Sequence, residues 1–412
     1  MVNRMIQPKK NIDKSRKLRH VCYDIRGPVL EKANTLIAAG HDILKLNIGN
    51  PAPFGLYAET RLKQALIDQL DAAQGYGESK GLFAARQAIH AHNMNHGFKN
   101  TSVDDIIIGN GVSELIVMAM QALLDDGDEM LIPMPDYPLW TAATHLAGGL
   151  ARHYLCDEHN DWRPNLADIE SKISKKTKGI LVINPNNPTG SVYDKDTLVA
   201  ITELARKHNL IIFADEIYDK ILYDGATHLS IASLQDDLTV ITFNGLSKSY
   251  RLAGFRAGWL TISGDKARAT DYIVGLNMLA SMRLCANMQA QFVIAEALNH
   301  DHSIYQLTAP GNRLHEQRNV AYERLNQIPG ITCTKPRGAI YLFAQLDTQR
   351  FNIQNDEQLM LDLVTQQKLL LVQGTAFNWH LPDHFRLVFL PSVPVLHDAM
   401  DRLTDFLKDY RQ

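Results

Sequence analysis

Short apolar runs alternate with helix-length segments between about residues 105 and 262. Several runs are continuously apolar, as expected for strands buried on both faces of a sheet. The pattern predicts a mostly parallel sheet with crossover helices. The seven expected strands are Ile106 to Ile108, Glu129 to Pro133, Arg152 to Leu155, Gly179 to Ile183, Leu210 to Ala214, Thr239 to Phe243 and Gly258 to Ile262.

Helical periodicity marks the segments between and after these strands. A further set of helices is expected up to about Glu323, and the last of them, which passes Arg313 and Arg318, is interpreted as a long helix joining two domains. The other expected helices are Pro28 to Ala39, Val112 to Leu124 and Lys195 to Lys207.

From about Ile331 the pattern changes to shorter strands and helices, which suggests a compact α+β unit. Strands are expected near Ala339 to Phe343, Leu369 to Val372 and Phe385 to Phe389, with helices near Glu357 to Gln366 and Leu396 to Leu407. We therefore predict an α/β fold with three parts. Residues 1–60 form an N-terminal arm and part of a small domain, 61–310 a large domain with a mostly parallel seven-stranded sheet, and 311–412 the rest of the smaller α+β domain.

Composition narrows the classes of protein. The chain has 412 residues and a net charge of -3, with acids and bases mixed, so nothing favours nucleic acid or an anionic membrane. No stretch approaches the roughly 20 apolar residues of a membrane span, and no secretory signal is present, so we expect a cytoplasmic protein. Four cysteines without CxxC spacing predict buried, reduced thiols, and the absence of HExxH predicts no metal site.

Polar segments follow several of the expected strands, at the edge where open parallel sheets bind ligands. The first, Gly109 to Ser113, can present backbone amides and a hydroxyl to an anion at a helix N-terminus. Glu114 stands where a GxGxxG dinucleotide turn needs its third glycine, so that interpretation fails. A phosphate cradle and a plain strand-to-helix turn both remain open.

Lys248 is the most informative candidate. Ser247 precedes it, Arg256 follows eight residues later, and Asp215 and Tyr218 lie some thirty residues before it. A lysine amine can condense with the aldehyde of pyridoxal phosphate, an acid can hold the pyridine nitrogen protonated, a phenol can steady the ring oxygen, and a serine and an arginine can take the phosphate. Each residue alone has an ordinary structural role, but the ordered set indicates a pyridoxal-phosphate site.

The loop Asn184 to Gly190 contains two prolines and three asparagines, which is typical of a rigid turn. Without the lysine, a purely structural loop would be the default interpretation. With it, Asn187 becomes a candidate donor to the cofactor's ring oxygen.

The NNPTG run ending at Gly190, the DEIY run Asp215 to Tyr218, and Ser247-Lys248 followed by Arg256 resemble the class I aminotransferases of fold type I. The resemblance covers essentially the whole chain and extends to Tyr76, Gly81, Arg86, Pro135 to Pro138 and Arg386. The runs Tyr23 to Pro28, Asn47 to Pro51 and Val372 to Phe377 are most similar to the alanine (glutamate-pyruvate) aminotransferases of bacteria.

This resemblance implies roles for individual residues. Lys248 would bind the cofactor and then act as general base between the substrate Cα and the cofactor's aldehyde carbon. Asp215 would pair with the pyridinium nitrogen, while Tyr218 and Asn187 would hydrogen-bond the ring oxygen. Tyr137, otherwise an ordinary core aromatic, would stack on the ring. The phosphate would be met by Gly111, Val112, Ser113, Ser247, Arg256 and, from a neighbouring subunit, Tyr76.

The resemblance also implies a homodimer with shared active sites and amino acid and 2-oxo acid substrates. Arg386, with Gly49 and Asn187, would bind the substrate α-carboxylate, although from sequence alone a surface arginine on a strand is the more ordinary interpretation. Many relatives carry a serine three residues before the lysine, where this chain has Gly245. The contacts that bind the phosphate are therefore expected to differ.

The implied reaction is a ping-pong exchange between L-alanine with 2-oxoglutarate and pyruvate with L-glutamate. An aminotransferase for aromatic or branched amino acids, and a pyridoxal-phosphate C-S lyase, stay open. A transcription regulator is disfavoured because no basic DNA-binding domain precedes residue 50. Arg283 is interpreted as an ordinary salt-bridge residue rather than a contact for the distal carboxylate of glutamate, and Tyr23 to Pro28 as a segment that folds over the site.

Overall fold

The computed structural model describes residues 11–18, 21 and 27–412. Within these ranges the main sheet has eight strands in the order β2-β9-β8-β7-β6-β3-β4-β5. The pairs β3-β4, β3-β6, β6-β7 and β7-β8 are parallel, and β9 runs antiparallel to both of its neighbours. The strands are β2 (Ile106–Gly109), β3 (Glu129–Met134), β4 (Leu150–Asp157), β5 (Arg163–Pro164), β6 (Thr177–Ile183), β7 (Ile211–Asp215), β8 (Thr239–Gly245) and β9 (Gly258–Gly264).

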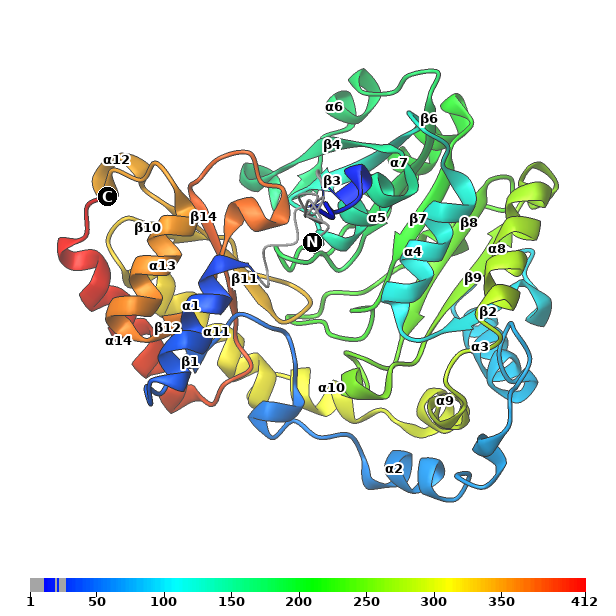
Figure 1. The fold of residues 1–412 in the computed structure, drawn as a ribbon, viewed down its shortest axis with the longest axis horizontal. Helices are drawn as coiled ribbons and strands as arrows, with labels where there is room; N and C mark the ends of the chain where they lie inside the picture. The colour runs from blue at the N-terminus through cyan, green and yellow to red at the C-terminus, as the bar shows by residue number, and fades with distance from the viewer. Residues whose placement is uncertain (1–10, 19–20, 22–26) are drawn as a thin grey trace, which may run out of the picture.

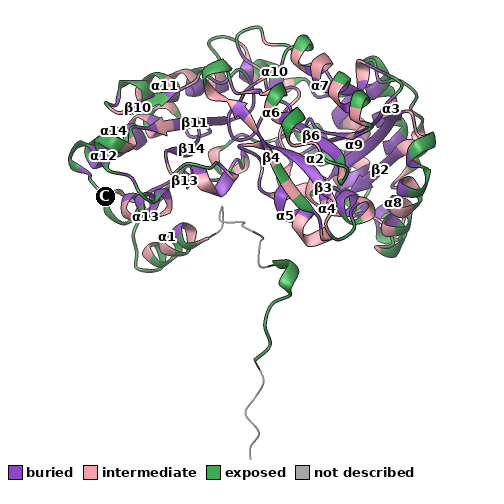
Figure 2. Cartoon of the chain, turned by 90° about the horizontal axis from the view of Figure 1, so that it is seen from above, coloured by how far each residue is buried: buried purple, intermediate pink, exposed green. Residues whose placement is uncertain are grey.

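The seven predicted strands are confirmed, and β5 is an additional short strand paired antiparallel to the end of β4. The apolar strands are buried on both faces by packed helices, as Figure 2 shows. On β6, Ile180 and Val182 belong to the core cluster that contains α7, whereas Leu181 and Ile183 belong to the cluster of the opposite face, which contains α4. The sheet is therefore the middle layer of three, and its helices include α4 (Val112–Leu123), α5 (Leu139–Ala147), α7 (Lys195–His208) and α8 (Thr270–Met282).

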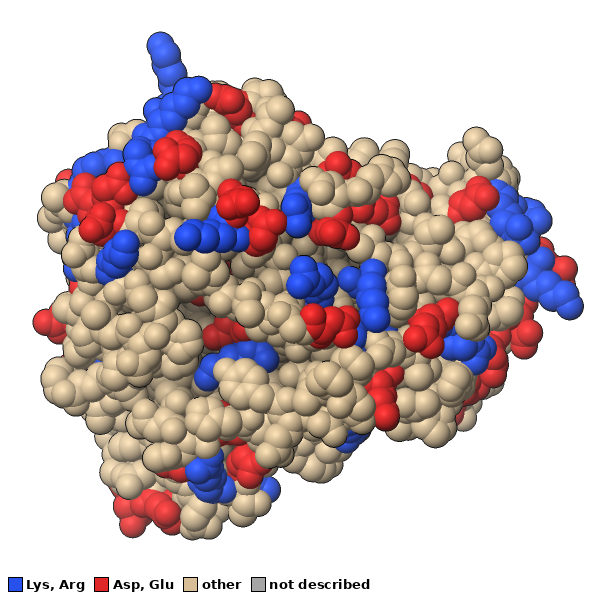
Figure 3. Space-filling view, turned by 180° about the vertical axis from the view of Figure 1, so that it is seen from behind, with Lys and Arg blue, Asp and Glu red and all other residues tan. Residues whose placement is uncertain are grey.

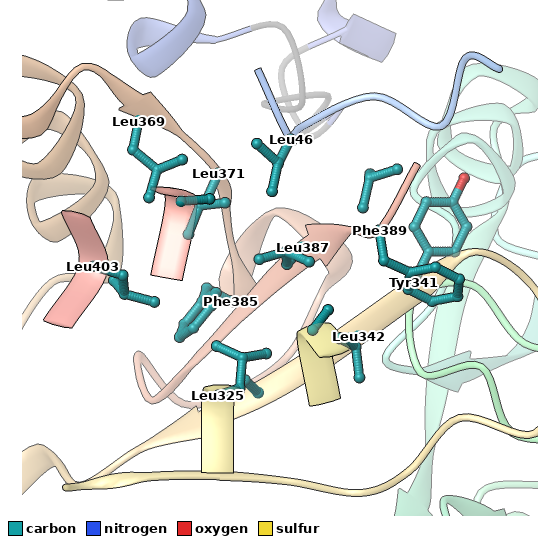
Figure 4. Close-up of a cluster of buried hydrophobic side chains, with 14 of the residues drawn as sticks. Leu46, Leu325, Tyr341, Leu342, Leu369, Leu371, Phe385, Leu387, Phe389 and Leu403 are labelled. Carbon is teal, nitrogen blue, oxygen red and sulfur yellow. The ribbon is translucent and has the colours of Figure 1, made fainter. Parts of the chain in front are cut away.

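The C-terminal part forms a separate α+β layer beside the main sheet (Figure 1). Its antiparallel sheet has the order β10-β11-β14-β13, with α11, α13 and α14 in the same core cluster. Leu46, Leu325, Leu387 and Leu403 are among the side chains packed in this cluster (Figure 4). Its elements are α11 (Arg313–Gln327), β10 (Ile331–Cys333), β11 (Tyr341–Leu346), α12 (Thr348–Phe351), α13 (Asp356–Gln367), β12 (Leu369–Leu370), β13 (Val372–Gln373), β14 (His384–Val388) and α14 (Val393–Asp409).

The N-terminal residues pack against this C-terminal layer. α1 (Pro28–Ala38) contributes Val29 and Ala33 to its core, and β1 (Leu44–Lys45) pairs with β12 in parallel. From there the chain passes through α2 (Thr60–Ile67) and α3 (Phe83–Asn95) to the main sheet. These contacts suit the three-part division made from the sequence, which stays a prediction.

The predicted set of helices up to about residue 323 is confirmed. It includes α9 (Met288–His300), α10 (Ser303–Thr308) and α11, which contains Arg313 and Arg318. Gly311, with a left-handed φ of +77°, lies between α10 and α11. Arg318 is fully buried in α11 and binds Asp224 through two hydrogen bonds of 2.7 and 2.8 Å, which ties this helix to the loop that follows β7.

The surface charges and the cysteines give no specific indication of function. Figure 3 shows acidic and basic side chains interspersed over the visible face. No helix in the described ranges is long and apolar enough to cross a membrane, and no metal-binding group of side chains occurs there. Cys156 and Cys333 are buried as predicted, but Cys285 is only half-buried, and Cys22 lies outside the described residues.

Candidate active site

The carboxyl ends of the central strands open onto a cavity of about 490 Å³ between the main sheet and the C-terminal layer. This is the edge at which an open parallel sheet binds its ligand. Apart from Gly111 and Tyr76, every site residue predicted from the sequence lines the cavity. They are Gly49, Val112, Ser113, Tyr137, Asn187, Asp215, Tyr218, Ser247, Lys248, Arg256 and Arg386.

Lys248 enters the cavity from the turn that follows β8. Its Nζ donates a hydrogen bond of 2.7 Å to the carbonyl oxygen of Gly49 and lies 5.7 Å from the centre of the Tyr218 ring. The amine is therefore held between the N-terminal segment and the end of β7. A primary amine in this position can attack a carbonyl carbon or move a proton.

Asp215 ends β7 and is buried beneath the cavity. Its Oδ2 accepts a hydrogen bond of 3.0 Å from Trp140 Nε1, and its Oδ1 accepts a longer one of 3.4 Å from the Ile217 amide. Burial raises the pKa of this carboxyl, while these donors and the charge of Lys248 oppose the rise. A buried carboxylate is stabilised by a cationic partner, so Asp215 is suited to hold a protonated ring nitrogen.

Arg386 is buried on β14, with 3% of its surface exposed. Its Nη1 donates to Asn187 Oδ1 at 3.0 Å and its Nη2 donates to the Asn47 carbonyl. The interpretation as a surface arginine is therefore wrong. A fixed guanidinium that lines a cavity is suited to bind a carboxylate bidentately.

The N-terminus of α4, which also lines the cavity, is suited to bind an anion. The N-cap of α4 is Gly111, which supplies no side-chain acceptor to the first amides of the helix, and Val112 and Ser113 line the cavity there. Arg256 lies beside them, held by the carbonyls of Ala253 at 2.8 Å and Asn110 at 3.3 Å.

Glycine is required where these segments meet. Gly111 has a left-handed φ of +83°, and a Cβ there would lie 2.3 Å from Arg256 Nη2. A Cβ at Gly258 would lie 2.6 Å from the Val112 nitrogen. Glu114 accepts from the Asn110 amide at 2.7 Å, which closes the turn where a dinucleotide fingerprint would need glycine.

The loop of residues 184–190 is held by its own side chains, as its composition predicts. Asn186 Oδ1 accepts from the amide and the hydroxyl of Thr189 at 3.1 and 2.9 Å, and Asn184 Oδ1 accepts from the Tyr193 amide at 2.9 Å. Asn187 alone of the three asparagines lines the cavity. Because its Oδ1 accepts from Arg386, its NH₂ group is left to donate to a ligand.

A family comparison supplies the class of protein. The family model described as aminotransferase class I and II matches residues 41–403. The chain belongs to the class I and II aminotransferases. It is 59% identical over 401 residues to the glutamate-pyruvate aminotransferase AlaA of Escherichia coli K12, covering 97% of this chain and 99% of that one.

Two further relatives agree with this class. The chain is 54% identical to the alanine aminotransferase of Mycobacterium bovis over 98% of its own length and 95% of the relative's. A crystal structure of an aminotransferase from Escherichia coli superimposes with a TM-score of 0.97 at 59% identity, over 98% of this chain and all of that one. The predicted fold type I is thereby confirmed.

The deviation from the expected aminotransferase pattern at Gly245 has a physical reason. A Cβ at Gly245 would lie 2.8 Å from the Ala257 carbonyl oxygen and 2.9 Å from Gly258 Cα, so a serine there requires β9 to shift. Arg283 binds Glu114 at 3.2 Å and the Ile108 carbonyl at 2.6 Å, in agreement with its interpretation as a salt-bridge residue.

Sequence reasoning missed two residues of this aminotransferase site. No role was predicted for Trp140, yet its indole Nε1 donates to Asp215 Oδ2 at 3.0 Å. Tyr341 was assigned to a strand without a role, yet it lines the cavity beside Tyr218 and Arg386. Their residue types and the nearby Pro135 to Pro138 turn gave no signal of either contact, because both depend on tertiary packing.

Asp136, in the turn that carries Tyr137, is expected to make the stability of the protein depend on pH. Asp136 is fully buried and accepts from Asn378 Nδ2 and Thr141 Oγ1, each at 2.7 Å. Burial raises the pKa of Asp136 to about 7, against these hydrogen bonds. The unfolded value is about 3.9, so the stability from this group is complete below about pH 4 and is lost as the pH rises through about 7.

We therefore expect Asp136→Asn to flatten the pH dependence of stability. Between pH 5 and pH 8 the free energy of unfolding should fall less in the variant than in the wild type, by on the order of a few kcal/mol. Denaturant unfolding at a series of pH values measures this. The exposed Asp126→Asn variant is the control, and equal pH slopes in all three proteins would contradict the prediction.

Proposed function

We propose that this chain is a pyridoxal 5'-phosphate-dependent aminotransferase that interconverts L-alanine and 2-oxoglutarate with pyruvate and L-glutamate by a ping-pong mechanism. The observation that carries the proposal is the placement of Lys248, Asp215 and Arg386 on one cavity. The names of the relatives at 54–59% identity support the choice of alanine and glutamate.

The donor set fits pyridoxal phosphate. The uncapped N-terminus of α4, Ser113, Ser247 and Arg256 would hold the phosphate, and Tyr137 would lie against the ring. Asp215 would bind the ring nitrogen, and Tyr218 with the Asn187 amide would donate to the ring oxygen. When bound, the cofactor supplies an aldehyde that takes up the amino group and a ring that accepts electrons from the Cα–H bond.

The chain's own residues then have distinct tasks. Arg386 binds the α-carboxylate, with Gly49 and Asn187 at the same end of the cavity, and so fixes the orientation of Cα. Lys248 Nζ, which is 2.7 Å from the Gly49 carbonyl, removes the proton from Cα and holds it for return. Buried Asp215 keeps its partner nitrogen protonated.

Steady-state assays with purified, cofactor-loaded protein test this proposal. Each of L-alanine, L-tyrosine and L-leucine is paired with 2-oxoglutarate, and cystathionine is offered alone to detect C-S lyase activity. We expect the highest kcat/KM with alanine, accompanied by pyruvate. A higher value with tyrosine or leucine, or sulfur release from cystathionine, would replace the proposed reaction.

Arg386→Lys is expected to lower kcat/KM for alanine on the order of 10²- to 10³-fold. A lysine keeps the charge but cannot bind a carboxylate, Asn187 and the Asn47 carbonyl together in one plane. The matched control is Arg402→Lys, because Arg402 forms a partly exposed helical pair with Asp398 far from the cavity lining. Equal kcat/KM in both variants would contradict the role of Arg386.

We propose further that the enzyme is a homodimer in which Tyr76 completes the partner's phosphate site. Tyr76 is 84% exposed and does not line the cavity of its own chain. On α8, three large apolar side chains lie at helical spacing and are more than half exposed. They are Val274, Met278 and Met282. Exposed apolar side chains at this spacing favour a subunit interface.

Light scattering should therefore give a mass twice the 46.2 kDa of the chain. Tyr76→Phe is expected to weaken cofactor binding about tenfold, since it removes one hydrogen bond to a charged group. Tyr57→Phe, at an exposed tyrosine outside the cavity lining, is the control and should bind as the wild type does. A monomeric mass with unchanged cofactor affinity in Tyr76→Phe would refute this assembly.

Two sequence predictions remain predictions. The expected fold-over of Tyr23 to Pro28 concerns residues of which only Gly27 and Pro28 are described. Truncation of residues 1–27 should broaden the range of accepted amino acids, and an unchanged preference would dismiss that role. A cytoplasmic location also stays a prediction.

A further inference from the structure

Tyr341 is the first residue of β11 and is 2% exposed. Figure 4 shows it at the margin of the buried cluster of the C-terminal layer. It also lines the active-site cavity, where it contacts Tyr218, proposed for the cofactor, and Arg386, proposed for the substrate. None of the roles assigned above uses it.

The hydroxyl of Tyr341 lies 2.6 Å from the hydroxyl of Tyr218, a direct hydrogen bond across the two layers. Gly49 leaves room for this contact, because a Cβ there would lie 2.3 Å from Tyr341 Oη. The N-terminal segment therefore determines where the phenol of Tyr341 can lie.

The ring of Tyr341 packs on the substrate arginine. Arg386 Cζ lies 4.4 Å from the centre of the Tyr341 ring and 4.5 Å from the centre of the Phe377 ring. A guanidinium this close to aromatic faces is attracted by their quadrupoles. The two rings therefore hold Arg386, but only Tyr341 carries a hydroxyl.

The proposed role of Tyr218 sets the direction of the hydrogen bond between the two phenols. Their hydroxyls lie 2.6 Å apart, and either one could be the donor. Tyr218 has a single proton, so it can donate to the cofactor's ring oxygen only if it accepts from Tyr341. In that arrangement Tyr341 donates and Tyr218 accepts.

We propose that Tyr341 is a positioning residue that links the two ends of the active site, its ring holding Arg386 and its hydroxyl fixing the direction of the single Tyr218 proton. A phenol has one proton and can also accept. Because Tyr218 accepts from Tyr341, its own proton is directed into the cavity. This inference rests on the proposed function, in which Tyr218 donates to the cofactor's ring oxygen.

The two contacts can be separated by substitution. Tyr341→Phe keeps the ring against Arg386 and removes the hydroxyl, whereas Tyr341→Leu removes both. Phe377→Leu is the matched control, because it removes an aromatic face from Arg386 and leaves the pair of phenols intact. The measurements are kcat and KM for alanine and the pH midpoint of the visible absorbance change of the cofactor-loaded protein.

Tyr341→Phe is expected to raise the midpoint by roughly half a pH unit, because a weakened hydrogen bond stabilises the ionised ring oxygen less. Its kcat should fall about threefold to tenfold, with KM changed less than about twofold. Phe377→Leu should raise KM about tenfold and leave the midpoint unchanged. Tyr341→Leu should show both effects.

An unchanged midpoint in Tyr341→Phe would overturn the inference, and so would a rise in KM equal to that of Tyr341→Leu. The proposed function fails separately, if the wild-type protein forms no pyruvate from alanine and 2-oxoglutarate. The midpoints test Tyr341 in that case too, because they require only that the cofactor binds. A protein that takes up no cofactor would end both proposals.

Discussion

Lys248→Ala is expected to abolish alanine transamination, with kcat lowered at least about 10⁴-fold. In the proposed mechanism the variant lacks both the amine that attaches the cofactor and the group that moves the Cα proton. It should still fold, because Lys248 is only half-buried and its side chain donates to the Gly49 carbonyl rather than to a side chain of the core. Pyruvate formation with 2-oxoglutarate as acceptor measures the loss, and thermal unfolding monitors the fold.

Lys248→Arg is the matched control for charge. An arginine can keep a positive charge near Gly49, but its guanidinium is always protonated and neither condenses with an aldehyde nor takes a proton. We expect the same loss as in Lys248→Ala. Recovery of more than about a tenth of the wild-type kcat in either variant would mean that another group does this chemistry.

Asp215→Asn is expected to lower kcat on the order of 10²- to 10³-fold and to weaken cofactor binding. An asparagine can still accept from Trp140, so the geometry at the end of β7 is retained. It cannot neutralise a protonated ring nitrogen, and leaving a buried charge without its partner costs about 3–5 kcal/mol. The measurements are kcat for alanine and the dissociation constant of pyridoxal phosphate.

Glu216→Gln provides a control one residue further along the chain. Glu216 is also a buried carboxyl, but it accepts from Ser230 Oγ at 2.9 Å and does not line the cavity. Burial raises its pKa well above the ordinary value, so a neutral glutamine is a close substitute. Near-wild-type kcat in Glu216→Gln beside a large loss in Asp215→Asn is the predicted contrast, and similar losses in both would contradict a special role of Asp215.

The succession of strands and helices along the chain could be predicted for the main sheet because its strands are short, continuous apolar runs separated by helical periodicity. β5 could not be predicted, because Arg163–Pro164 has no periodicity and pairs only through the tight return from β4. The start of α11 could not be predicted, because it follows the left-handed Gly311 rather than a change in the repeat of apolar positions.

The residues proposed for the cofactor could be predicted to share one edge of the sheet because they follow strand ends in fixed motifs, as Lys248 and Asp215 do. The place of the residue proposed for the substrate carboxylate was harder to predict. The sequence pattern indicates an exposed strand position for Arg386. Its burial results from Tyr341 and Phe377, which come from other elements. Tyr76 cannot be placed from one chain, because its proposed contact belongs to a second subunit.

The most direct measurement is a pair of half-reactions with cofactor-loaded protein, followed by visible absorbance and product analysis. L-alanine alone should abolish the absorbance of the lysine-bound cofactor and release about one pyruvate per chain, and 2-oxoglutarate added next should restore it and yield glutamate. Absorbance that alanine leaves unchanged, with no pyruvate released, would contradict the assignment of this chain as an alanine aminotransferase.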